Sequence, residues 1–497
     1  MHLFKKSSLF ILSVTLTACA VGPDFLRPSA PKVSNYTHGS LPQQTASIPN
    51  VKGAEAQHFD PAAKISADWW KLYASEPLNK LINQALTANP DLKAAEASLK
   101  EAQENVYAAE GAFLPSFNLN ETPTREKFSP ASFGLPGKSS IFTIYNTNVS
   151  VSYGLDIFGG SRREVEALQA QAEYQQFQLQ AARISLTANV ATTYIQQASL
   201  QEQIRETENI IKLEKEQLTI LQNQFNLGAI PKTAVLSQQT TLAQVEATLP
   251  GLRKSLTVQQ HQLAVLTGHF PDELADDESG LDTLYLPTDL PLTIPSDLVS
   301  QRPDIRESEA LLHAASAQIG VATANMLPQL NITGSYGSSA LKTSDIFTKS
   351  NEVWNIAGGL TQPLFHGGTL FHERRAAVDA FKVAAAQYQG TVLKSFQNVA
   401  DVLRALQYDA ETLVAQNQAA DAAKNSLDLA RSQFKEGAIS YLTLLDSERQ
   451  YEQTDLSLIQ AQAARYADTA ALFQALGGGW WNQPQTAKDS KNTREKK

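Results

Sequence analysis

The stretch "NPDLKAAEASLKEAQENVYAAEGAFLPSFNLN", residues 89–120, decides the fold because the chain contains it twice. Residues 302–333, "RPDIRESEALLHAASAQIGVATANMLPQLNIT", align with it without a gap at an offset of 213 (302 minus 89). The aligned identities include Pro90 and Pro303, Asp91 and Asp304, Glu96 and Glu309, Ala97 and Ala310, Pro115 and Pro328, and Asn118 and Asn331. A repeat at a fixed offset indicates that one structural unit is present twice.

Two further pairs of segments extend the duplication. "LDIFGG" (155–160) matches "QPLFHGG" (362–368) with one inserted residue, and "QFNLGAI" (224–230) matches "QFKEGAI" (433–439) at an offset of 209 (433 minus 224). Because three matches occur in the same order, each half of the chain is predicted to be one unit of roughly 200 residues with the same parts in the same sequence.

Each unit is predicted to begin with a helix and to continue with strands. Residues 90–112 and 303–326 are rich in Ala, Leu and Glu, open with a proline at the first helical position and stop before a second proline. Apolar residues then alternate with small or polar ones in "IYNTNVSVSYGLDI" (144–157), "LNITGSYG" (330–337) and "WNIAGGL" (354–360), and more weakly from Phe117. This alternation is typical of barrel strands between lipid and lumen, and equally of half-buried strands in a soluble sheet.

Very long helices are predicted after the paired glycines. Residues 162–226 contain neither proline nor glycine, and residues 369–435 contain only Gly390. At 1.5 Å per residue, each stretch would reach about 100 Å. Their apolar residues recur at spacings of three, four and seven, which predicts a seam against another helix.

Both long helices are predicted to reverse at a glycine. Gly228 and Gly437 suit the position after a helix end, where the left-handed conformation is common. The chain then returns through residues 232–267 and 441–476. These glycines are predicted to mark two hairpin tips. The alternative is that they only terminate the helices.

The N-terminus predicts export and a lipid anchor. Lys5 and Lys6 precede the short apolar run "LFILSVTL", which ends at small residues as a secretory signal does. "LTAC" (16–19) resembles the bacterial lipobox, and this resemblance implies that Cys19, the only cysteine, is acylated after cleavage. Ala20 in place of Asp points to the outer membrane. The alternative is an ordinary signal peptide with a chance cysteine.

Composition and motifs argue against nucleic-acid binding and against catalysis. The formal charge of −9 gives no electrostatic reason to bind nucleic acid. The eight histidines are scattered, and the chain has no His-Glu-x-x-His, no nucleophile elbow and no phosphate-binding glycine loop. The carboxylates of "PDELADDES" (271–279) favour a solvated loop over a cation site. We therefore expect no catalytic residue, no metal and no cofactor.

The predicted strands require several chains. After residue 18 no apolar run is long enough for a transmembrane helix, so a spanning structure would have to be a β-barrel. Four strands per chain cannot close a barrel, and an open sheet edge cannot be left in lipid. Two chains would give eight strands and three would give twelve, and the alternation favours neither.

Several motifs in fixed order resemble the outer-membrane factor family, the TolC-like and OprM-like channel-tunnels, of which the NodT-type lipoproteins are part. They are the lipobox, "VGPDFLRP" (21–28), the paired "LDIFGG" and "PLFHGG", "YLTLLDSERQ" (441–450) and "ALGGGW" (475–480). The resemblance implies a mainly α fold with a transmembrane β-barrel, in which a trimer joins a twelve-stranded barrel to an α-barrel of long helices. It also implies a periplasmic adaptor protein and an inner-membrane transporter, often of the resistance-nodulation-division type, as partners in efflux. The hairpin tips at Gly228 and Gly437 are then expected to dock the adaptor protein.

The same resemblance gives a segmentation of the chain. We expect a signal peptide (1–18), an acylated linker and equatorial segment (19–88), a first repeat (89–268), an equatorial connector (269–301), a second repeat (302–477), and a C-terminal equatorial segment with a disordered tail (478–497). Trp69, Trp70 and Trp480 are expected to pack a belt around the helices rather than to bind a ligand. The alternative to a channel is a lipid-anchored periplasmic coiled coil that does not conduct.

A gate is predicted just past the second tip. Leu442, Asp446 and Arg449 are spaced by four and three residues, so they share one helix face. The first repeat has uncharged residues at the equivalent positions, which are Thr233, Ser237 and Thr240. Similarity to the family places its aperture residues at the same three positions. Arg449 of the same or a neighbouring chain, or a bound cation, is expected to compensate Asp446; the alternative is an ordinary surface pair.

Replacement of Cys19 tests the anchor. The mature protein should incorporate labelled palmitate and begin at Cys19, and Cys19→Ser should abolish the label, because the thiol is the acylation site. Export should fall only modestly, since the barrel strands already hold the protein in the bilayer and one acyl chain binds only marginally. Complete loss of the folded oligomer in Cys19→Ser would contradict this expectation.

Overall fold

The computed structural model describes residues 20–273 and 280–482. The chain divides into two compact units. The strand unit comprises Met1–Pro28, Ser98–Gln176 and Glu307–Gln389, and the hairpin unit comprises Ser29–Ala97, Phe177–Arg306 and Gly390–Lys497. Each unit therefore draws one part from each sequence repeat. Cys19 and the predicted signal peptide (1–18) lie outside the described residues.

The six long helices predicted from the repeat are confirmed. They are α3 (Pro90–Glu110), α4 (Gly160–Asn226) and α5 (Lys232–Leu266) in the first repeat, and α7 (Pro303–Ala324), α8 (Thr369–Lys435) and α9 (Tyr441–Ala475) in the second. The helices α4 and α8 have 67 residues each, and α5 and α9 have 35 each. Equal lengths at equivalent positions show that the duplication extends to the backbone.

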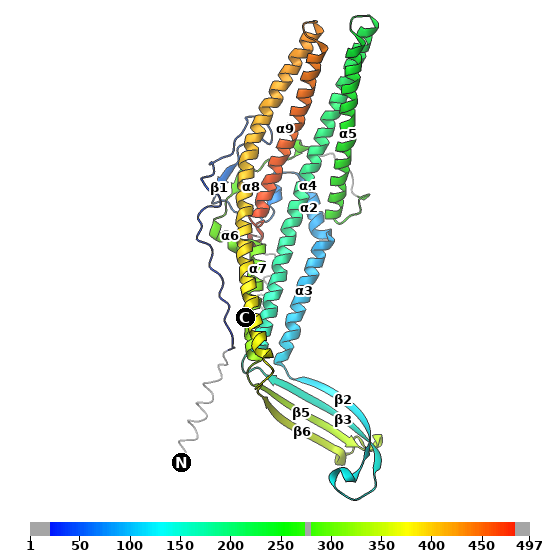
Figure 1. The fold of residues 1–497 in the computed structure, drawn as a ribbon, viewed down its shortest axis with the longest axis vertical. Coiled ribbons are helices and arrows are strands. Elements are labelled where there is room, and N and C mark those ends of the chain that lie inside the picture. Colours follow the sequence, from blue (N-terminus) through cyan, green and yellow to red (C-terminus); the bar gives the residue numbers. More distant parts are fainter. Residues whose placement is uncertain (1–19, 274–279, 483–497) are drawn as a thin grey trace. The chain divides into compact units, whose positions relative to one another are not determined.

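The strand unit contains one four-stranded antiparallel sheet, in which the strands lie side by side (Figure 1). Its strands are β2 (Ser116–Phe128), β3 (Ser140–Leu155), β5 (Gln329–Ala340) and β6 (Glu352–Thr361), in the order β2-β3-β5-β6. Each repeat supplies one hairpin, and β3 pairs with β5 to join them. The edge strands β2 and β6 are exposed along their whole length. The sheet therefore has two unpaired edges in a single chain.

The segment 21–28, which we call the strap, packs against α4 and α7 within the strand unit. Asp24 accepts from Arg163 of α4 at 2.7 Å, and Arg27 lies 2.9 Å from Glu309 of α7. Since the Arg163 side chain is only 6% exposed, its ion pair with Asp24 is protected from water on one side. Two ion pairs thus fasten the strap to α4 and α7.

Aromatic packing in the hairpin unit matches the expected belt. The Trp69 ring stacks on Phe473 of α9 with centroids 5.2 Å apart, and both Trp69 and Trp70 are buried. Trp480 donates its indole N–H to the Gln301 carbonyl at 2.7 Å. Trp69 and Trp70 are therefore packing residues, Trp480 is only half-buried, and the belt as a whole stays a prediction.

The belt also holds one fully buried arginine. Arg465 of α9 has no exposed surface and donates to Thr45 Oγ1 at 2.8 Å and to the carbonyl oxygens of Gly53 and Glu55. Burial lowers the pKa of Arg465 to about 10, which leaves it charged at neutral pH. These bonds fasten the N-terminal loop 45–55 to α9.

The remaining elements are short. They are β1 (His58–Asp60), which pairs in parallel with β4 (Asp289–Pro291), the helices α2 (Glu76–Ala88) and α6 (Pro295–Gln301), and the 3-10 turns Trp69–Tyr73, Gly111–Phe113, Pro130–Phe133, Leu281–Thr283, Thr343–Asp345, Lys349–Asn351 and Trp480–Asn482.

Gly337→Ala tests the central strand pairing. Gly337 of β5 lies opposite Asn148 of β3, and an added Cβ would collide with the Asn148 Cα at 2.5 Å and with the Thr147 carbonyl oxygen. We expect the free energy of unfolding to fall by about 1–3 kcal/mol, as overpacking usually costs. Thermal melting followed by circular dichroism measures it.

Gly358→Ala on β6 is the matched control, because a Cβ there meets no atom within 4 Å. Equal melting temperatures for both variants would show that the close approach of β3 and β5 does not limit stability.

Candidate functional site

Both hairpin tips turn through a glycine in the left-handed conformation. Gly228 has φ of 75° and Gly437 has φ of 70°. At the second tip, Ala438 N–H donates to the Gln433 carbonyl at 2.8 Å and Gly437 N–H donates to the Phe434 carbonyl at 2.9 Å. This is the Schellman pattern, and the first tip has the same pair of bonds. An added Cβ would meet no atom within 4 Å at either glycine, so the constraint is conformational.

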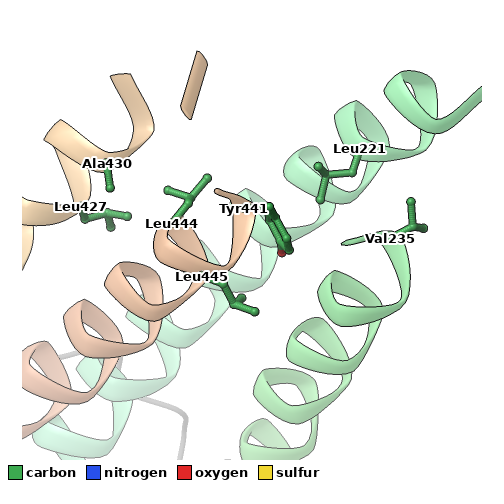
Figure 2. Packing of buried hydrophobic residues seen from close by; sticks show 7 residues of the cluster. All are labelled: Leu221, Val235, Leu427, Ala430, Tyr441, Leu444 and Leu445. Carbon is green, nitrogen blue, oxygen red and sulfur yellow. The ribbon is translucent and has the colours of Figure 1, made fainter. Parts of the chain in front are cut away.

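A shared apolar core lies beneath the tips and joins the two hairpins (Figure 2). Figure 2 shows Tyr441 directed from α9 toward Leu221 of α4 and Val235 of α5. The seven buried side chains of this tip core are Leu221, Val235, Leu427, Ala430, Tyr441, Leu444 and Leu445. All four helices contribute, so movement of one hairpin against the other must break this packing.

The three predicted gate residues lie on an exposed face of α9. Leu442 is 62% exposed, and Asp446 and Arg449 are exposed as well. Arg449 Nη2 donates to Thr241 Oγ1 at 3.3 Å and to Gln244 Oε1 at 3.2 Å, both on α5. Among the described residues there is no hydrogen bond or ion pair between Arg449 and Asp446. Within one chain, Arg449 therefore links α9 to α5 instead of compensating Asp446.

The structure adds two residues that the sequence did not single out. Glu214 of α4 is 4% exposed and Glu448 of α9 is 8% exposed. Their carboxyl groups lie close enough to share a hydrogen bond when one of the two is protonated. Burial, and next the Glu214 charge, raise the pKa of Glu448 to about 8. Burial also raises the pKa of Glu214, although hydrogen bonds from Gln238 and Glu448 oppose the shift. Burial of both acids therefore favours the protonated form of Glu448.

One signal in the sequence marks this pair. Glu448 lies three and four residues after the buried Leu445 and Leu444, so it continues the apolar stripe of α9. The second acid comes from α4, more than 200 residues away in the chain. Spacing along one helix cannot reveal such a partner.

A family model described as outer membrane efflux protein matches residues 81–269 and 294–478. The chain belongs to this family. The two matched stretches contain the two predicted repeats almost completely, so this efflux protein owes its family membership to the duplicated unit.

Known relatives share nearly the full length of this efflux protein. The pyoverdine export outer membrane protein OpmQ of Pseudomonas putida is 28% identical over 484 residues, covering 97% of this chain and 98% of OpmQ. The cation efflux system protein CusC of Escherichia coli is 27% identical over 481 residues, covering 95% of this chain and 98% of CusC.

A solved structure supports the same fold. The outer-membrane channel OprN superposes with a TM-score of 0.83 at 27% identity, covering 93% of this chain and all of the OprN chain. The predicted fold class, an α-barrel continued by a β domain, is thereby confirmed, as is the outer-membrane location.

The described residues contain neither a membrane-spanning helix nor a cluster of metal-binding side chains. No helix in residues 20–273 and 280–482 combines the length and the apolar character needed to cross a bilayer. In the same ranges, no three His, Cys, Asp or Glu side chains lie together as the ligands of a metal ion would.

Gly437→Val tests the tip turn. A left-handed residue with a Cβ costs about 1–2 kcal/mol, and a β-branched one is worse. We therefore expect hydrogen–deuterium exchange of the amides at 433–440 to accelerate about tenfold, as measured by mass spectrometry. Gly437→Asn, which tolerates this conformation, is the control and should exchange at nearly the wild-type rate. Equal exchange in both variants would show that the turn does not require the left-handed backbone.

Proposed function

We propose that the protein is the outer-membrane channel of a tripartite efflux pump, conducting substrates passively from the periplasm to the exterior. The observation that carries this proposal is the duplicated unit, each copy of which supplies one strand hairpin before its long helix and one helical hairpin tip after it. Family membership and the likeness to the OprN channel support it. A conduit of this kind needs no catalytic step of its own.

The unpaired edges of the sheet require partner chains, and the resemblance to the outer-membrane factor family implies that three chains form a homotrimer. The unpaired N–H and C=O groups of β2 and β6 have to be bonded when the sheet lies in lipid. Three copies of β2-β3-β5-β6 pair edge to edge, β6 of one chain with β2 of the next, and close a twelve-stranded barrel around a lumen. Outer-membrane lipid then contacts the exposed apolar side chains of the sheet, among them Trp354 and Ile356.

The partners are a periplasmic adaptor protein and an inner-membrane transporter, of the resistance-nodulation-division type. The tips around Gly228 and Gly437 are the surface for the adaptor. The two tips present different chemistry, since Leu227 is 84% exposed at the first tip and the charged Glu436 stands at the equivalent position of the second. An adaptor can therefore distinguish them.

The cargo is set by the inner-membrane transporter. OpmQ is named for pyoverdine export and CusC for cation efflux, and this chain is equally similar to both. Relatives with such different cargo share one conduit, which favours a channel with little selectivity of its own. In this proposal the signal peptide (1–18) is removed, Cys19 is the acylated first residue of the mature chain, and equatorial segments flank the two repeats (89–268 and 302–477).

Leu442, Asp446 and Arg449 form the periplasmic gate. Their exposed face of α9 carries an apolar residue and a carboxylate that each recur three times in a trimer. Three carboxylates near one axis repel, so Arg449 of a neighbouring chain or a bound cation compensates them. Arg449 also restrains α9 through its bonds to Thr241 and Gln244 of α5.

Asp446→Ala combined with Arg449→Ala tests the gate. Removing the carboxylate ring and the link to α5 should raise the closed-state conductance severalfold in planar bilayers and sensitise cells to large antibiotics. The control is Ser237→Ala with Thr240→Ala, the equivalent positions of the first repeat, which should conduct like wild type. Unchanged conductance of correctly folded Asp446→Ala, Arg449→Ala trimers would refute the gate.

A further inference from the structure

A polar junction lies beside the tip core, where each of the four hairpin helices contributes one group. Glu214 comes from α4, Gln238 from α5, Arg431 from α8 and Glu448 from α9. Gln238 Nε2 donates to the Glu214 backbone carbonyl at 3.0 Å and also to Glu214 Oε2. Arg431 Nε is 3.8 Å from Glu448 Oε1, too far for a good hydrogen bond. The junction is thus built around two acids with little cationic compensation.

Hydrogen-bond accounting requires a proton between these acids. Glu448 Oε2 is buried and has no donor when the carboxyl is ionised. A protonated Glu448 donates to the Glu214 carboxylate, which already accepts from Gln238. One proton therefore satisfies both side chains, whereas two buried carboxylates in contact would repel each other in a medium of low dielectric constant.

The surrounding charges do not remove this requirement. The side chain of Arg431, the charged group of α8, is 39% exposed and solvated. On α9, Arg449 donates to Thr241 of α5, and its charge opposes the rise in the pKa of Glu214 without cancelling it. Glu452 is another acid whose pKa burial raises, and the buried Tyr441 hydroxyl stays neutral because burial raises its pKa as well. Toward the pair, α5 presents the uncharged Gln238.

We propose that Glu214 and Glu448 form a proton-binding site that locks α9 onto α4 beneath the hairpin tips. With the proton bound, one hydrogen bond joins the two helices and the tip core closes over it. Loss of the proton places two like charges in the seam and favours separation of the α8–α9 hairpin from the α4–α5 hairpin. The consequence for conduction rests on the proposed function, because α9 also carries the gate residues.

The direction of the pH dependence follows from linkage. When the seam is closed, the pKa of Glu448 is about 8, against an ordinary value of 4.5 when the seam is open and solvated. The closed seam therefore binds more protons than the open one. The equilibrium constant for closing the seam is largest below about pH 4.5. Between about pH 4.5 and about pH 8 it falls by at most about tenfold per pH unit, and above about pH 8 it no longer changes.

A second acid pair continues the same seam. Asp455 of α9 lies near Glu206 of α4, and burial followed by the charges of Glu206 and Glu202 raises the pKa of Asp455 to about 6. Lys424 of α8 opposes this shift. The α4–α9 seam is therefore acidic over several turns, and its second pair releases its proton at lower pH than the first.

A distance measurement tests the lock without requiring conduction. Spin labels at the exposed positions Lys212→Cys and Gln450→Cys, in full-length trimers with Cys19→Ser, report the separation of α4 and α9 by pulsed electron paramagnetic resonance. Between pH 5 and pH 8 we expect the long-distance population to grow at least tenfold. Glu448→Gln, which keeps a neutral donor next to Glu214, should remain at short distance throughout.

The controls separate the pair from general effects of pH. Glu216→Gln, an exposed acid two residues from Glu214 with no role in the junction, should respond like the unsubstituted protein. Glu214→Gln removes the like charge and should therefore reduce the opening seen at pH 8, which keeps the proposal testable if Glu448→Gln does not fold. A distance distribution that ignores pH, or a Glu448→Gln variant that responds like the parent, would overturn the lock.

Conductance of the same samples separates the lock from the proposed function. Opening of the seam with a parallel rise in conductance supports both. Opening of the seam without any change in conductance supports the lock and refutes the gate on α9.

Discussion

A polypeptide in lipid has to bond every backbone N–H and C=O group within protein, and this requirement governs the molecule. One chain supplies a sheet of four strands whose outer members, β2 and β6, have one unpaired side each. Neither edge is covered by another strand in residues 20–273 and 280–482. The proposed oligomer is what supplies the missing partners of these edges. The long helices have the same rotational symmetry as the strands in this oligomer, because both belong to the same chains.

Duplication with divergence explains how one chain combines regular architecture with specific sites. The two repeats agree in helix length and in the geometry of both glycine turns, because these features build the scaffold. They differ in the charged residues near the tips. Asp446 has the uncharged Ser237 as its counterpart at an offset of 209 (446 minus 237), and Glu448 has Gln239. Asp446 and Glu448 thus occur once per chain without a charged counterpart in the first repeat, whereas each helix and glycine turn of the repeat occurs twice.

Most of the fold was predictable because proline, glycine and periodicity mark the element ends. The weakest prediction concerned β2, for which only the residues after Phe117 indicated a strand. The structure extends β2 to Phe128 through a polar stretch with Pro123, because the long strand β3 provides a partner for every residue of it. Sequence patterns report burial, and a fully exposed strand carries little of that signal.

The site was less predictable than the fold. Positions on one face of α9 follow from spacing, but partners on other helices do not. Arg449 contacts α5 rather than Asp446, and Glu448 meets an acid on α4. Both contacts depend on how two hairpins are packed together, which periodicity within a helix does not encode.

The strap has a consequence for how the protein meets the membrane. Asp24 and Arg27 hold it by ion pairs to helices of the strand unit, so Val21 has a fixed place close to the sheet. Cys19 is two residues from Val21, and two residues of fully extended chain span about 7 Å. A lipid on Cys19 would therefore limit how deeply the sheet can enter the leaflet during insertion.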